Sequence, residues 1–364
     1  MKPGTLPAAR APQPGAGLPG PGGIGTDALV PGFPLLEVEG LCVHFPTASG
    51  PAKALDGIAL LVRRRESVGV LGEFGAGKTT LVDALMDLVQ GPGRIVAGRI
   101  AFAGRDMGAM SAAERVNERG RRIAVIASDS RRALDPACAI ETQLDEALQV
   151  HVPTPRLAAR EHIRAALLRA GIAFPDEVLH AFPMSLPLPV AQRIGVALAF
   201  LHGPELVMAD DPARALEPAA RAALLYDIGT AAREVGATML WLSEDPDLLK
   251  GVAARLMVLY AGRIVEEGPT DAILRDPAHP YTRGIVDALP VTGLRAGRLK
   301  PTAGKPPTAH AMPSGCAFRE RCGHAMRACV AAPALSVVGD EAGGGGGGRA
   351  VRCHHPLVRP RFTT

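Results

Sequence analysis

The sequence predicts an α/β protein with an inserted α-helical subdomain and an irregular, cysteine-containing C-terminal extension. Three observations lead to this prediction. Apolar runs of strand type alternate with helical segments, an Ala-, Leu- and Arg-rich helical stretch interrupts them at about residues 105–201, and regular patterning ends near residue 288. We therefore expect a flexible Pro/Gly-rich tail at 1–33, a core domain at 34–288 and an extension with a Gly-rich loop at 289–364.

Five segments of the core have the composition of β-strands. They are residues 35–45, where apolar and polar residues alternate, and the apolar runs at 54–62, 67–71, 205–209 and 237–242. Their alternation with helical segments around the inserted block is typical of an α/β core.

The overall composition excludes several classes of protein. A formal net charge of +4 is small for 364 residues, and 4% aromatic residues leave few rings to stack on bases, so nucleic acid is not an expected partner. The sequence has no uninterrupted apolar run long enough to span a membrane and no export signal. Six cysteines in a chain of this size do not suggest a disulfide scaffold, so we expect a cytoplasmic, reducing compartment.

Residues 72–80 contain the most specific motif of the chain. They fit G-x-x-x-x-G-K-[ST] between the strand at 67–71 and a segment at 81–88 with apolar residues at helical spacing. Glycines let backbone N–H groups point at phosphate oxygens, and the start of the helix adds positive potential. We expect Lys78 to reach the β- and γ-phosphates and the Thr79 hydroxyl to ligate Mg²⁺. The predicted nucleotide-binding residues of this loop are Gly72, Glu73, Phe74, Gly75, Ala76, Gly77, Lys78, Thr79 and Thr80.

The apolar strand at 205–209 ends in two carboxylates, Asp210 and Asp211. Alone, such a pair is more often a turn or a helix cap. Downstream of a phosphate-binding loop, it predicts that Asp210 holds Mg²⁺ through water and that Asp211 faces the γ-phosphate.

From about Leu35 to Leu289 the chain resembles the ATP-binding subunits of ABC transporters, in particular those of bacterial oligopeptide and dipeptide importers. The resemblance rests on residues 72–80 and on four further segments, at 140–148, 192–199, 260–268 and 279–284. It implies a P-loop ABC-type ATPase core that uses ATP and Mg²⁺. It also implies a peripheral protein on the cytoplasmic face of the plasma membrane, which works with two permease subunits and an extracytoplasmic substrate-binding protein.

The resemblance also suggests one residue outside the phosphate loop. Phe45 matches the aromatic residue that stacks on adenine in this family, although the sequence position alone is more typical of a core residue.

The chain departs from the family pattern at the signature motif. Where the family has Leu-Ser-Gly-Gly, this chain has Leu186, Pro187, Leu188 and Pro189. Proline has no N–H and leucine no hydroxyl, so most donors aimed at the γ-phosphate held by a partner subunit are absent. A proline at the first helical position still permits the following helix.

Three more departures surround the expected γ-phosphate. Asp211 stands in place of the catalytic glutamate and is one methylene shorter. Glu244 stands in place of a histidine, and a carboxylate beside a polyanion is repulsive. Ser128 aligns with the glutamine that links Mg²⁺ to the membrane subunits, and its side chain is shorter.

The four departures together predict that ATP binding is kept and turnover is weakened. We expect the chain to be the degenerate half of a heterodimeric ATPase with an intact partner subunit. The alternative is a regulatory or structural pseudo-ATPase without turnover of its own. A soluble ABC protein acting on nucleic acid agrees less well with the importer-type segments. The sequence does not name the cargo, since related importers transport peptides, nickel or glutathione.

Four of the six cysteines lie in the extension, at Cys316, Cys322, Cys329 and Cys353. Four thiolates can ligate a [4Fe–4S] cluster or a zinc ion, and the lack of a C-x2-C pair disfavours a zinc ribbon. The importer branch has a C-terminal extension of this pattern, which in some members holds an iron–sulfur cluster. We expect such a cluster here, with unligated thiols as the alternative.

Overall fold

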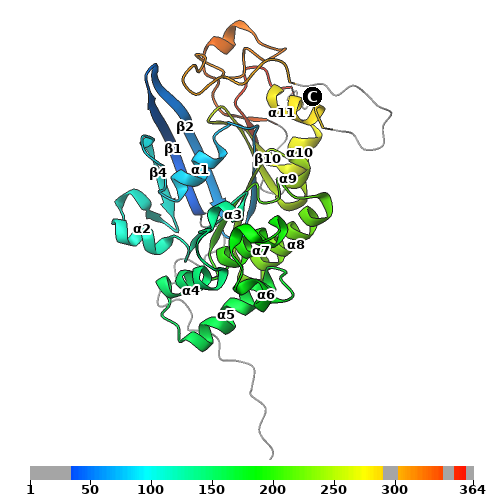
Figure 1. The fold of residues 1–364 in the computed structure, drawn as a ribbon. Coiled ribbons are helices and arrows are strands. Elements are labelled where there is room, and N and C mark those ends of the chain that lie inside the picture. The colour runs from blue at the N-terminus through cyan, green and yellow to red at the C-terminus, as the bar shows by residue number, and fades with distance from the viewer. Residues whose placement is uncertain (1–33, 290–301, 339–347, 358–364) are drawn as a thin grey trace, which may run out of the picture.

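The computed structural model describes residues 34–289, 302–338 and 348–357, so the predicted tail at 1–33 and most of the Gly-rich loop lie outside it. Its strands form a four-stranded sheet of order β2-β1-β4-β5 and an eight-stranded sheet of order β11-β12-β10-β9-β3-β8-β7-β6 (Figure 1). The strands are β1 (Pro34–Thr47), β2 (Gly50–Arg63), β3 (Ser67–Leu71), β4 (Arg94–Phe102), β5 (Arg105–Asp106), β6 (Ile123–Ile126), β7 (Leu206–Asp210), β8 (Thr238–Ser243), β9 (Arg255–Tyr260), β10 (Arg263–Pro269), β11 (Ser336–Val338) and β12 (Arg349–Val351).

The helices connect these strands and cover the larger sheet. Within the described residues, none is both long and apolar enough to cross a bilayer. The α-helices are α1 (Lys78–Leu85), α2 (Ala112–Glu118), α3 (Ser130–Ala133), α4 (Ile140–His151), α5 (Arg156–Arg169), α6 (Pro175–Leu179), α7 (Leu188–Ala199), α8 (Pro218–Val235), α9 (Pro246–Val252), α10 (Thr270–Arg275) and α11 (Pro280–Asp287).

The centre of the larger sheet is parallel and buried on both faces. Strands β6, β7, β8, β3 and β9 pair in parallel, and β10 joins them antiparallel to β9. Along β8, Leu240 and Leu242 face the core shared with the smaller sheet and α1. Met239 and Trp241 face a second core, shared with α8 and with the inserted helices α3 to α7, which we call the helical arm. The period of two along each strand therefore divides the apolar residues between two cores.

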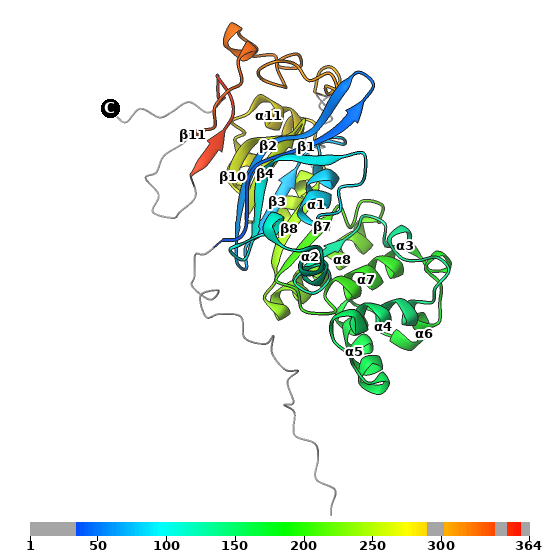
Figure 2. The same ribbon diagram turned by 90° about the vertical axis from the view of Figure 1, so that its left-hand side faces the viewer.

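The inserted helical subdomain is smaller than the sequence predicted. Helices α3 to α7 gather at one end of the molecule, away from the C-terminal extension, in both views (Figures 1 and 2). The predicted block at 105–201 begins too early, however, because β6 lies inside it and pairs with β7 at the edge of the larger sheet. β6 has only four residues, too few to show a clear period within a helix-rich stretch.

Candidate nucleotide-binding site

The phosphate loop connects β3 to α1 at the carboxyl edge of the parallel strands. Gly77 caps α1 with φ at 109°, a conformation that L side chains rarely adopt. A Cβ on Gly77 would lie 2.7 Å from the Ala54 carbonyl oxygen, and one on Gly72 would lie 2.6 Å from the Leu259 carbonyl oxygen. The loop therefore needs glycine at both positions, and its neighbours on β2 and β9 fix its shape.

Lys78 is the cation of this loop. Its ammonium donates to the Gly72 carbonyl oxygen at 2.7 Å and to the Glu73 carbonyl oxygen at 3.2 Å. Burial lowers the pKa of the Lys78 ammonium, and nearby carboxylates, of which Glu244 acts most strongly, oppose this shift. The ammonium is thus held at the loop by carbonyl groups that a phosphate oxygen can replace.

The structure brings Thr79 and Asp210 together. The Thr79 hydroxyl donates to the Asp210 carboxylate at 3.0 Å, across 131 residues of sequence. Both side chains line a cavity of about 300 Å³, and Ser128 lines it too. Hydroxyl and carboxylate oxygens are the ligands that Mg²⁺ prefers, so these residues fit the predicted magnesium site. Burial raises the pKa of the Asp210 carboxyl, which the Thr79 hydrogen bond partly offsets.

Asp211 is held firmly at the end of β7. Its carboxylate accepts a hydrogen bond from the Ser243 hydroxyl at 3.0 Å, and only 7% of the residue is exposed. Its φ is 49°, in the left-handed region that aspartate tolerates better than most residues. Burial raises the pKa of the Asp211 carboxyl; Ser243 opposes the shift and the Glu244 charge adds to it.

Glu244 follows β8 and stands beside the described cavity without lining it. It pairs with Arg214, whose Nη2 is 3.1 Å from a Glu244 carboxylate oxygen. The Arg214 guanidinium also lies over the Phe74 ring, 5.8 Å from its centre. Arg214 lines the nucleotide cavity but is absent from the sequence prediction. Its position three residues after Asp211 was the one feature of the sequence that placed it near the site.

The C-terminal extension forms one wall of this cavity, which the sequence did not predict. Pro307, Ala309 and Met312 line it opposite the phosphate loop. The backbone N–H of Lys53 donates to the Ala309 carbonyl oxygen at 2.8 Å, which fastens the extension to β2. The core domain and the extension therefore share the site.

A second contact joins the extension to the phosphate loop itself. Arg321 donates to the Glu73 carboxylate at 2.7 Å and to the Tyr260 hydroxyl at 3.2 Å. The backbone N–H of Glu73 donates to the Tyr281 hydroxyl at 3.0 Å. Tyr260, Tyr281 and Phe318 pack ring against ring beneath this contact, with centroids 4.4 to 5.5 Å apart.

Two of the predicted groups lie elsewhere. Phe45 packs against Gly93, where an added Cβ would lie 2.4 Å from the ring, and it does not line the described cavity. The residues at 186–189 lie at the start of α7, capped by Pro187, and they do not line it either. The helix does form as the proline argument predicts. The stacking of Phe45 on adenine and the role of the signature in a dimer stay predictions.

Gln192 is a further residue that the prediction missed. It is fully buried on α7, and its amide bridges the ends of two elements. Its side-chain oxygen accepts from the Ser130 N–H at 3.1 Å, and its nitrogen donates to the Ala127 carbonyl oxygen at 2.5 Å. Gln192 thus ties the helical arm to the segment that places Ser128 in the cavity.

The four cysteines of the extension border one small cavity beneath Phe318. Burial raises the pKa of the Cys353 thiol to about 11, and it also raises the pKa values of Cys316 and Cys322. Among the described residues, no group of three or more His, Cys, Asp or Glu side chains is arranged to hold a metal ion. The described side chains therefore form no ready-made metal site at these cysteines.

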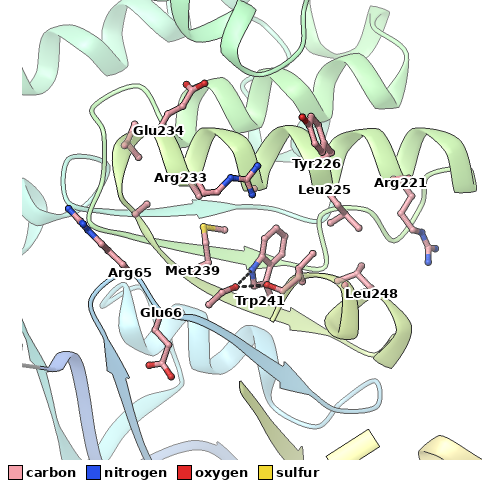
Figure 3. A pocket seen from close by; sticks show the side chains of 18 of the residues that line it. Arg65, Glu66, Arg221, Leu225, Tyr226, Arg233, Glu234, Met239, Trp241 and Leu248 are labelled. Carbon is pink, nitrogen blue, oxygen red and sulfur yellow. Dashed lines mark hydrogen bonds between the residues drawn. The ribbon is translucent and has the colours of Figure 1, made fainter. Parts of the chain in front are cut away.

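A large cavity lies apart from the phosphate loop, between α8, α9 and the central strands β3 and β8 of the larger sheet (Figure 3). It has a volume of about 1150 Å³, and Trp241 and Met239 form part of its floor. Much of its charged rim is neutralised within the chain: Arg221 pairs with Asp245, Glu66 with Arg255 and Glu234 with Arg169. We assign it no ligand.

Comparison with known proteins agrees with this fold. The family described as ABC transporter matches residues 55–214, and the family described as oligopeptide/dipeptide transporter, C-terminal region, matches residues 265–329. A dimeric ATP-binding cassette, MJ0796, in a post-hydrolysis state bound to ADP and phosphate superposes with a TM-score of 0.59 at 17% identity, over 65% of this chain and 98% of that one. That similarity shows the fold.

Similar sequences identify the family. The dipeptide transport ATP-binding protein DppD of Escherichia coli (strain K12) is 33% identical over 324 residues, which cover 89% of this chain and 97% of that protein. The oligopeptide transport ATP-binding protein OppD of Bacillus subtilis (strain 168) is 33% identical over 296 residues, covering 80% of this chain and 82% of that protein. With its phosphate loop, its Asp210 strand and its C-terminal region all matched, this chain belongs to the family of ATP-binding proteins of dipeptide and oligopeptide ABC transporters.

Proposed function

We propose that this chain is the ATP-binding subunit of an ABC importer of dipeptides or oligopeptides, and that it couples ATP binding and hydrolysis to transport. One observation supports nucleotide binding above all: Lys78, Thr79 and Asp210 converge on one cavity beside a glycine-shaped loop. Membership of the family supports the transport role. Bound Mg²⁺ would supply charge neutralisation for the phosphates, while the residues of the chain hold and orient them.

Nucleotide binding is tested with the purified chain. Wild-type protein is expected to bind Mg-ATP, and Lys78→Ala is expected to lose most of this affinity because no other cation emerges from the loop. Lys250→Ala, an exposed lysine on α9, is the control. Wild-type protein that binds no nucleotide, with or without partner subunits, would contradict the proposal.

We infer that the chain is the degenerate half of a heterodimeric ATPase with an intact partner subunit. The support is the replacement of the signature by residues 186–189 and the short carboxylate at Asp211, fixed against Ser243. The isolated chain is expected to hydrolyse ATP very slowly, and the complex with its partner faster. Substantial activity of the isolated chain that Asp211→Asn removes would refute this reading.

The partners follow from the transport role. We propose that the chain sits peripherally on the cytoplasmic face of the plasma membrane, bound to two permease subunits that receive cargo from an extracytoplasmic substrate-binding protein. Co-purification of permease subunits tests this. Peptide uptake in cells carrying Lys78→Ala separates a working ATPase from a pseudo-ATPase: loss of uptake favours the former, and unchanged uptake the latter.

We further propose that Cys316, Cys322, Cys329 and Cys353 hold a [4Fe–4S] cluster. The support is that all four border one cavity and that the family's C-terminal region includes three of them. The thiolates of a cluster stand farther apart than the ligands of a single ion, because the cluster lies between them. Anaerobically purified protein should contain iron and show cluster absorbance in visible light. Iron-free protein with all four thiols free to react would remove the proposal.

A further inference from the structure

The charges around the nucleotide cavity do not match its expected ligand. Two carboxylates line the cavity, those of Asp210 and Asp211, and Glu244 stands beside it in an ion pair with Arg214. Lys78 is the single cation that the loop itself provides. A triphosphate brings more negative charge into the same space. Mg²⁺ at Thr79 and Asp210 would offset part of it, but Glu244 and Asp211 remain unfavourable neighbours for a γ-phosphate.

Two cations outside the loop line the cavity. Lys53 pairs with Asp56 at 3.8 Å, and Arg214 is the one that pairs with Glu244 and can restore the balance. It enters from the segment between β7 and α8, and it lines the cavity together with Lys78 and Asp211. Half of its side chain is exposed, so packing does not lock it in place. Glu244 is its ion-pair partner among the described residues, and the Phe74 ring at the tip of the phosphate loop lies under its guanidinium.

Both partners of Arg214 hold its guanidinium beside the phosphate loop. Phe74 is 77% exposed, and it stands two residues before Ala76 in the loop that wraps the nucleotide. A guanidinium presents several N–H groups in one plane, which suits two oxygens of a terminal phosphate better than a point charge does. The γ-phosphate is also the part of ATP that ADP lacks.

We propose that Arg214 binds the γ-phosphate of ATP held by the same chain, and that Glu244 acts as a positioning residue that keeps the guanidinium at the cavity. This rests on the proposed nucleotide binding. Arg214 then discriminates ATP from ADP. Glu244, whose charge repels the phosphates of ATP, orients the Arg214 guanidinium that recognises them. Glu244 is thereby compensated rather than simply repulsive.

The test compares the affinities of the full chain for Mg²⁺ complexes of ADP and of a non-cleavable ATP analogue, measured by titration calorimetry. Arg214→Ala should weaken analogue binding about 10- to 100-fold, the loss typical of charge-assisted hydrogen bonds, and change ADP affinity less than about twofold. Arg214→Lys should recover part of the loss. Arg221→Ala, which breaks an arginine–carboxylate pair outside this cavity, should change neither affinity.

A double variant distinguishes a direct contact of Arg214 with the γ-phosphate from simple neutralisation of the Glu244 charge by Arg214. Glu244→Gln should keep the preference for the analogue, because its amide oxygen still accepts from Arg214, whereas Arg214→Ala/Glu244→Gln should stay weak. If the double variant regains wild-type affinity, or if Arg214→Ala leaves the ratio of the two affinities unchanged, the proposal is wrong. Retained ADP binding shows that each variant is folded. Wild-type protein that binds neither nucleotide would instead contradict the proposed function.

Discussion

At the scale of single residues, the nucleotide cavity gathers groups that do not stabilise the fold. Asp211 is buried, close to Glu244, and strained at positive φ. Such residues persist because the surrounding structure fixes them and because they serve the ligand. Folding disfavours the ionised form of such a group, so replacing it by a neutral side chain should raise the free energy of unfolding.

Asp211→Asn is therefore expected to stabilise the nucleotide-free protein at neutral pH. Folding raises the pKa of this carboxyl from 3.8, so ionisation costs more in the folded than in the unfolded state. The penalty is absent below the unfolded pKa, grows as pH rises toward the folded pKa, and is complete above it. Urea unfolding followed by the fluorescence of Trp241, the single tryptophan, measures the difference.

The pH dependence is the decisive part of that experiment. Asparagine also tolerates positive φ, and that benefit does not change with pH. The advantage of Asp211→Asn should shrink as pH falls toward the unfolded pKa. An advantage that is constant with pH would show that backbone strain alone, and not the buried charge, separates the two proteins.

Gly77 provides a second test at this scale. Gly77→Ala places a Cβ 2.7 Å from the Ala54 carbonyl oxygen at φ of 109°, so the loop must move. We expect a loss of about 1–3 kcal/mol in the free energy of unfolding and loss of Mg-ATP binding. Gly75→Ala is the control: its φ is 81°, but no heavy atom lies within 4 Å of the added Cβ. Equal effects of the two would show that the clash is unimportant.

At the scale of elements, the phosphate loop depends on a segment about 250 residues away. Arg321 is nearly buried and connects Glu73, Tyr260 and the Ala303 carbonyl oxygen. The loop is therefore shaped by its flanking strand and helix and also braced by the extension. A charged group at such a junction, when removed, leaves its partners unpaired.

Arg321→Ala should weaken nucleotide binding without removing any group that faces the phosphates. We expect the free energy of unfolding to fall by at most about 3–5 kcal/mol, because the partner Glu73 is not fully buried. We also expect faster proteolysis of the extension. Calorimetry and limited proteolysis measure the two effects. Arg319→Ala is the matched control, since it removes hydrogen bonds to Ser314 and a 4.0 Å ion pair with Glu320 but no contact with the phosphate loop among the described residues. Unchanged affinity in Arg321→Ala would show that the extension does not brace the loop.

At the scale of the whole molecule, the helical arm presents α7 at a distance from the chain's own cavity. Its first turn contains Pro189 and is capped by Pro187, so N–H groups are missing where an anion would approach a helix start. On the proposed heterodimer this face would meet the nucleotide of the partner subunit.

The triple variant Pro187→Ser/Leu188→Gly/Pro189→Gly should raise ATP turnover of the complete transporter. The restored backbone N–H groups and hydroxyl give the partner's nucleotide the donors that it lacks. Steady-state hydrolysis by the purified complex measures the effect, and the isolated chain with the same changes should stay slow. Unchanged turnover of the complex would contradict the claim that this segment limits it.

The sequence alone determined the parts of the site that lie within one strand–loop–helix unit. Lys78 and Thr79 follow from local backbone chemistry, and an apolar strand that ends in Asp210 defines the opposite ligand. The chain order and the carboxyl edge of the sheet then bring them together. The same local pattern predicted helix α7 despite its two prolines, since a proline in the first helical turn lacks only an N–H that has no partner there.

Only the tertiary structure decided which distant residues complete the site. Arg214 turns toward Glu244 and Phe74, and the extension supplies Arg321 and one wall of the cavity. No periodicity or short motif encodes such contacts, because they depend on how two separately folded elements pack and on which charges remain unpaired between them. Hydrogen-bonding rules act along a few residues of chain, whereas packing and electrostatics act through space.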